Sequence, residues 1–97
     1  MFLGAFHFDG NQDELLAAYG RLMQTYPPDS LELHVCIQRD QGITVYDACP
    51  SRPDFEAFTG GSEFRTALRA AGLPEPRIDP LGEVYAAHIR QTVGAGV

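Results

Sequence analysis

The chain contains no tryptophan, only two cysteines and few basic residues. Seven Lys and Arg stand against thirteen Asp and Glu among 97 residues, which gives a formal net charge of −6. Nucleic acids and anionic membranes attract clustered cations, so this composition argues against either as a partner. The two cysteines, Cys36 and Cys49, are too few for a disulfide scaffold and match no metal-ligand spacing.

Long apolar runs are also missing. Nowhere do eighteen apolar residues follow one another, as a membrane-spanning helix requires. The N-terminal stretch 1–8 lacks the basic start of a secretory signal, and we expect a cytoplasmic protein. Apolar residues make up 44% and charged residues 21%, values that are ordinary for a folded domain. The length predicts a single domain over residues 1–90, followed by a flexible tail over residues 91–97.

The hydrophobic periodicity predicts the order strand, helix, strand, strand, helix, strand. The expected strands are 2–8, 31–38, 43–49 and part of 81–89, and the expected helices are 12–26 and 52–71, with a break at Gly60 and Gly61. Asn11 and Ser51 are suitable N-cap residues, Ser62 can cap the helix again after the break, and Gly72 can close it in the left-handed conformation. This order is typical of the ferredoxin-like α+β fold, βαββαβ. It predicts a four-stranded antiparallel sheet in the order 4-1-3-2, with both helices on one face.

The segment 31–38 alternates apolar and polar residues. The pattern predicts that Leu33, Val35 and Ile37 face the helices, whereas His34 and Cys36 face the other side.

The sequence 40–42 predicts a three-residue hairpin loop in which Gly42 has a positive φ. Arg39 would then pair with Ile43, and Cys36 with Tyr46. In that register the two cysteines point to opposite faces, so we expect no disulfide between them.

The sheet face without helices is expected to be only half polar. Its predicted residues are Leu3, Ala5, His7, His34, Cys36, Thr44, Tyr46 and Ala48. A lone domain rarely exposes so large an apolar patch, and we therefore expect a second copy to cover it, sheet against sheet, in a homodimer. The alternative is a monomer with a partly aromatic surface.

Three stretches of the sequence resemble a known superfamily. They are Gly42–Ser51 (GITVYDACPS), Phe55–Phe58 (FEAF) and Ala70–Pro74 (AAGLP). They are similar to the dimeric α+β barrel proteins, in particular the antibiotic biosynthesis monooxygenases and related small bacterial proteins. The resemblance covers most of the chain, up to Tyr85. It implies a ferredoxin-like homodimer with a pocket for a small organic, aromatic or polyketide-like ligand and cofactor-free chemistry. Cys49 stands where such proteins have tryptophan, so the tryptophan used in their oxygenation has no counterpart here.

The candidate site lies around the hairpin of the second and third strands. His34 and Tyr46 are predicted to share a face, where an imidazole with a near-neutral pKa and a phenol can polarise a carbonyl or transfer a proton. Asp47 is predicted on the helix-facing side. It is either a structural acceptor of backbone N–H groups at the start of the second helix or a general base in a pocket between sheet and helices. His34, Tyr46 and Asp47 are therefore the predicted catalytic residues.

The remaining predicted pocket residues contact the ligand without reacting. They are His7, Cys36, Phe55, Phe58 and Tyr85. By helical spacing, Phe55 and Phe58 also belong to the core. The three histidines His7, His34 and His88 lack metal-ligand spacing, so we predict neither a metal nor a cofactor.

Two functions fit these patterns. The first is a small-molecule enzyme, a cofactor-free oxygenase, isomerase or cyclase, in a homodimer with one apolar pocket per subunit. The alternative is a non-catalytic ligand-binding or dimerisation module. A haem-handling protein is a third possibility, which a Soret band after addition of haemin would reveal.

Overall fold

A computed structural model describes residues 1–27 and 31–89 of the chain. The elements are β1 (Phe2–Asp9), α1 (Gln12–Thr25), β2 (Leu33–Arg39), β3 (Gly42–Cys49), α2 (Arg52–Gly60), α3 (Ser62–Ala71) and β4 (Arg77–Glu83). The predicted C-terminal tail, 91–97, lies outside the described residues. None of the helices that the structure describes is long and apolar enough to cross a membrane.

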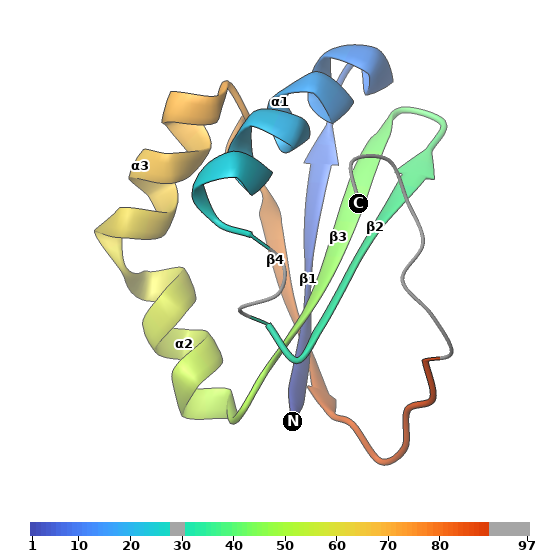
Figure 1. Cartoon of the computed structure of the whole chain (residues 1–97), viewed down its shortest axis with the longest axis vertical. Coiled ribbons are helices and arrows are strands. Elements are labelled where there is room, and N and C mark those ends of the chain that lie inside the picture. The colour runs from blue at the N-terminus through green and yellow to red at the C-terminus, as the bar shows by residue number, and fades with distance from the viewer. Residues whose placement is uncertain (28–30, 90–97) are drawn as a thin grey trace.

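The four strands form one antiparallel sheet in the order β2-β3-β1-β4, which is the order 4-1-3-2 counted from the opposite edge. The three helices gather on one side of this sheet (Figure 1). The α+β class and its ferredoxin-like arrangement are therefore confirmed. The predicted second helix is two helices, α2 and α3, separated at Gly61.

Local signals explain most helix ends. The side chains of Asn11 and Ser51 accept hydrogen bonds from the backbone N–H groups of Glu14 and Asp54, as N-caps do. Gly72, with φ of 90°, ends α3 in the left-handed conformation. The prediction that Ser62 caps α3 was wrong, because Gly61 is the N-cap residue and Ser62 is the first residue of the helix.

The core lies between the helices and the face of the sheet that they cover. Phe6, Ile43 and Phe55 are almost fully buried there. The Phe6 ring lies 5.8 Å from the Phe55 ring and 5.2 Å from the Phe64 ring, within the range of favourable tilted aromatic pairs. Phe6 of β1 thus packs the sheet against both α2 and α3.

The last strand begins earlier than predicted. We expected it within 81–89, but β4 runs from Arg77 to Glu83 and contains Pro80. Proline cannot donate to a strand neighbour, and it is tolerated here because β4 is an edge strand. The register shift between Leu3 and Gly4 falls opposite the same segment of β4.

The β2–β3 hairpin has a different register from the predicted one. Its loop has two residues, Asp40 and Gln41, and Arg39 pairs with Gly42 instead of Ile43. Gly42 does not have a positive φ. It is required for another reason, since a Cβ at this position would overlap the carbonyl oxygen of Phe8.

The one-residue shift reverses both faces of β2. His34 pairs with Asp47 and Cys36 with Val45 on the helix-covered face. The apolar residues Leu33, Val35 and Ile37 occupy the other face, opposite Ala48, Tyr46 and Thr44 respectively. The predicted neighbours Cys36 and Tyr46 are therefore separated. Cys36 and Cys49, both free thiols, share the helix-covered face instead of lying on opposite faces.

Candidate functional site

A small apolar cavity of about 70 Å³ lies between α1, the α2–α3 pair and the sheet. Its walls are mostly aliphatic and aromatic side chains, namely Phe6, Phe8, Leu22, Met23, Tyr26, Pro27, Leu31, Val45, Phe58, Phe64, Leu68 and Leu73, to which Tyr19, His34 and Asp47 add polar atoms. Tyr26 and Phe58 are each about 37% exposed, so this wall reaches the protein surface. No lysine or arginine is found among the described residues that line the cavity.

Three polar side chains form a hydrogen-bonded chain at the cavity wall. The Nδ1 atom of His34 lies 2.5 Å from Oδ1 of Asp47, and its Nε2 atom lies 2.5 Å from the hydroxyl oxygen of Tyr19. The side chains of His34 and Asp47 are only 9% and 12% exposed. Cross-strand pairing of β2 with β3 sets the His34–Asp47 contact, and α1 supplies Tyr19.

The arrangement orients the imidazole. Because a carboxylate can only accept, the Nδ1–H group of His34 donates the hydrogen bond to Asp47. In the neutral tautomer, Nε2 of His34 then accepts the hydrogen bond from the Tyr19 hydroxyl. Asp47 also stabilises the imidazolium that forms when Nε2 takes up a proton, the part that a carboxylate plays beside a catalytic histidine. Nε2 is the basic atom of this site.

Tyr19 is fixed by stacking as well as by its hydrogen bond. Its ring lies nearly parallel to the His34 imidazole, with an interplanar angle of 8° and centroids 5.8 Å apart. Burial, with smaller contributions from Cys36 and Asp47, raises the pKa of Tyr19 to about 12. The phenol therefore stays protonated at neutral pH and acts as a hydrogen-bond donor to His34.

The cysteines are poor nucleophiles in this environment. Burial raises the pKa of Cys36 to about 11, and Asp47 adds to the effect. Burial also raises the pKa of Cys49. Since the thiolate is the reactive form, both thiols are kept in their unreactive state near neutral pH.

The structure brings together only part of the predicted site. His34, Asp47 and Phe58 line the cavity. Phe55 is buried in the adjoining core, and Cys36 packs against that core from β2.

The other predicted site residues lie elsewhere. His7 and Tyr46 are on the sheet face without helices, where Nδ1 of His7 is 3.0 Å from the Thr44 hydroxyl. Tyr85 follows β4 with its side chain fully in solvent. The grouping of His34 with Tyr46 was therefore wrong, because it relied on the incorrect hairpin register.

Two expectations about Asp47 are decided by these contacts. It lies on the helix-facing side, as predicted. The hydrogen bond found for its carboxylate is to His34, rather than to backbone N–H groups at the start of α2.

Tyr19 is the cavity residue that sequence reasoning missed as a functional candidate. Its spacing in α1 marked it as a core aromatic residue, and an aromatic residue on a buried helix face carries no signal for a polar role. Only the position of His34 beneath α1 gives its hydroxyl a partner.

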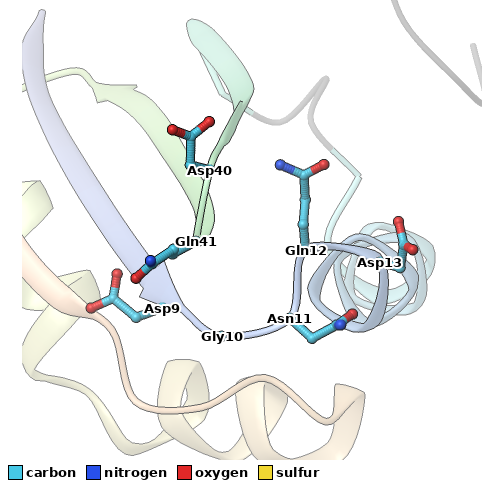
Figure 2. A pocket seen from close by; sticks show the side chains of 7 residues that line it. All are labelled: Asp9, Gly10, Asn11, Gln12, Asp13, Asp40 and Gln41. Atoms are coloured by element: carbon cyan, nitrogen blue, oxygen red, sulfur yellow. The ribbon is translucent and has the colours of Figure 1, made fainter.

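A second, wider hollow of about 680 Å³ lies where the β1–α1 loop meets the hairpin loop. Figure 2 shows Asp9, Asp13 and Asp40 spread around its rim instead of converging on one point. Asp9 is already paired with Arg39 and Arg77. Among the residues that the structure describes, no three His, Cys, Asp or Glu side chains are grouped to hold a metal ion. This hollow therefore has no group of side chains arranged to contact one bound molecule. The apolar cavity has such a group in Tyr19, His34 and Asp47.

Comparison of the chain with known family models, with curated proteins and with solved structures gave no match.

Proposed function

We propose that this protein binds a small, uncharged organic molecule in the apolar cavity and transfers a proton to or from it through Nε2 of His34. The observation that carries the proposal is the Tyr19–His34–Asp47 chain at an otherwise apolar wall. A buried polar group in such a wall directs a ligand, and an imidazole backed by a carboxylate is suited to general acid–base catalysis. The described part of the lining contains no lysine or arginine, which disfavours phosphorylated or carboxylated ligands.

The chemistry supported best is isomerisation or ring closure of an enolisable carbonyl or phenolic compound. A ligand O–H or acidic C–H displaces the Tyr19 hydroxyl from Nε2 of His34. The proton moves to Nε2, its bonding electrons remain on the ligand as an enolate or phenolate, and Asp47 stabilises the imidazolium. Return of the proton to a different ligand atom completes an isomerisation. Cofactor-free oxygenation, which the resemblance to the antibiotic biosynthesis monooxygenases suggests, starts with the same deprotonation and would also require dioxygen.

We further propose that the chain acts as a homodimer of the dimeric α+β barrel type. The face opposite the helices carries Val35 at 41% exposure and Ile37 at 38%, beside Leu3, Leu33 and Tyr46. Exposed branched aliphatic residues on a continuous sheet surface favour association with a second sheet. The observed register makes this face more apolar than the predicted one, since Val35 and Ile37 replace His34 and Cys36.

The proton-transfer proposal can be tested with 5-nitrobenzisoxazole. Removal of the proton at C3 of its isoxazole ring by a base breaks the N–O bond and opens that ring to a coloured cyanophenolate, so the rate reports an accessible base in an apolar pocket. We expect the protein to accelerate this elimination. The acceleration should fall at least a hundredfold in His34→Ala and persist in the control His88→Ala, which removes an exposed histidine that does not line the cavity.

Tyr19→Phe sharpens the test. Because this change frees Nε2 of His34 from its hydroxyl partner, we expect a faster reaction with this probe and an unchanged fold by circular dichroism. Equal rates in the wild type, His34→Ala and His88→Ala would contradict catalysis by His34.

The alternative, a non-catalytic binding module, makes a different prediction. Binding of the neutral fluorescent phenol 2-naphthol would then be weakened by cavity changes such as Leu68→Trp, while no variant affected the elimination rate. The cavity is small for either function, because about 70 Å³ is less than the roughly 150 Å³ of a cavity that holds benzene. Under either function, the walls around Tyr26 and Phe58 must open to admit an aromatic ring.

A further inference from the structure

The segment that follows β4 presents apolar side chains to solvent. We call residues 84–89 the C-terminal arm. Tyr85 is 103% exposed and Ile89 is 61% exposed, and Leu81, just before the arm, is 48% exposed. Figure 1 shows this segment, in orange to red, leaving the end of β4 as a loop that belongs to none of the four strands. A group of exposed apolar side chains marks an interaction surface, and these three lie within nine consecutive residues.

The start of the arm is held in place. The backbone N–H of Val84 donates to the carbonyl oxygen of Met1 at 2.8 Å, and the N-terminal amino group lies 2.9 Å from Oε1 of Glu83. These contacts hold the first residue of the arm beside the N-terminus, where β1 pairs with β4. Leu3, on the face without helices, pairs there with Gly82, two residues before the arm begins. Tyr85 therefore projects from a defined position at the border of the open face.

The area of that face favours a contribution from the arm. Four strands about 4.8 Å apart, with about eight residues at 3.3 Å each, form a flat face of roughly 500 Å². Its middle, at Ala5, Thr44 and Ala48, is already buried within one chain, so the area open to a partner is smaller. A stable dimer buries about 800 Å² on each partner, so the sheet face alone falls short. One fully exposed tyrosine can bury about 150–250 Å², and Ile89 adds to it. The arm can therefore supply the remaining area, about 300 Å² for each partner.

The arm is also long enough to reach a second copy. Facing sheets pack about 10 Å apart, whereas five extended residues beyond Val84 span about 17 Å. We propose that the C-terminal arm of each copy crosses to the other copy and packs Tyr85 and Ile89 against its open face beside Val35 and Ile37. This inference rests on the homodimer proposed above and adds a reciprocal exchange of arms to it.

The equilibrium test uses the full chain in sedimentation velocity over a concentration series. We expect the double variant Tyr85→Ser/Ile89→Ser to raise the dimer dissociation constant at least thirtyfold. The control Ile78→Ser removes another partly exposed aliphatic side chain, one on the helix-covered face of β4, and should leave that constant within threefold. A wild type that remains monomeric would refute the dimer and the arm exchange together. A wild-type dimer with an unchanged constant in the double variant would refute the arm exchange alone.

A cross-linking test identifies where the arm goes. With p-benzoylphenylalanine in place of Tyr85, irradiation should produce a species of two chains, joined between the arm and residues 33–49. Cross-links only within one chain would show that the arm folds back on its own sheet and would overturn the exchange. Mixing isotopically labelled with unlabelled chains before irradiation separates these two outcomes by the mass of the linked peptides.

Discussion

The two faces of the sheet differ in a way that reverses the usual expectation. The helix-covered face places a hydrogen-bonded His34–Asp47 pair inside the core, whereas the face without helices carries Val35 and Ile37 where a monomer would have polar residues. Both features depend on β2, because His34 of this strand points inward to Asp47 of β3 whereas Val35 and Ile37 point outward. A polar pair inside an apolar wall indicates a site, and exposed apolar residues on the face without helices indicate a partner. The orientation of a single edge strand therefore underlies both proposals.

The largest difference between the faces should be their contribution to the stability of one subunit. Phe6→Ala removes a buried ring that contacts Phe55 and Phe64, and we expect a loss of about 3–5 kcal/mol in the free energy of unfolding. Ile37→Ala, on the open face, should cost about 1 kcal/mol or less in dilute protein. Urea denaturation at concentrations below the dimer dissociation constant measures both. Equal losses would mean that the open face is packed within a single subunit.

The open face should instead dominate association. Val35→Asp brings a charge to the proposed interface of each copy, and we expect the dimer dissociation constant to rise at least a hundredfold, about 3 kcal/mol. Val35→Thr, nearly equal in shape, should have a smaller effect. Sedimentation equilibrium measures the constants, and circular dichroism checks that the subunit still folds. If Val35→Asp dimerises as the wild type does, the sheet face is not the interface.

The polar pair on the covered face should contribute a smaller stabilisation. Asp47→Asn keeps the shape of the side chain but removes the charge that accepts from Nδ1 of His34, so we expect a loss of about 1–3 kcal/mol at neutral pH. A double-mutant cycle with His34→Gln, read by urea denaturation, isolates the coupling of the two side chains. Additive losses would indicate that the contact contributes nothing beyond packing.

The last prediction concerns the thiol of Cys36 on the covered face. The raised pKa of Cys36, about 11, means that little thiolate exists at pH 8, and the fraction increases as the pH rises toward 11. We expect Cys36 in the folded protein to react with iodoacetamide at pH 8 about a hundredfold more slowly than an unperturbed thiol. Mass spectrometry of timed samples measures this, with protein in urea as the control. Equally fast alkylation in both samples would show that this face is open to solvent.

The hairpin shows where sequence reasoning succeeded and where it failed. The alternation in 31–38 correctly predicted a strand, and Asn11, Ser51 and Gly72 correctly marked helix ends, because those signals depend on neighbouring residues. The choice of face failed, because it assumed that apolar residues always point to the core of one chain. Gly42 was attributed to a positive φ, whereas it is needed for its close approach to β1, a contact distant in sequence.

The same limit applies to the site. Asp47 and His34 were singled out as chemically capable residues, and the structure brings them together across the hairpin. Tyr19 could not be assigned to them, because its hydroxyl comes from α1, fifteen residues before His34. Tyr46 was assigned to them through the register error, although the same β3 strand carries it on the opposite face.

The amino-acid sequence by itself determined the order of helices and strands and the fold class, since hydrophobic period, caps and turn residues act over a few positions. Only the tertiary structure decided which face of β2 meets the helices, because the two-residue turn and the fit of Gly42 against Phe8 set the register. That one-residue choice moved His34 into the cavity and Val35 out of it, and no local pattern in the chain encodes it.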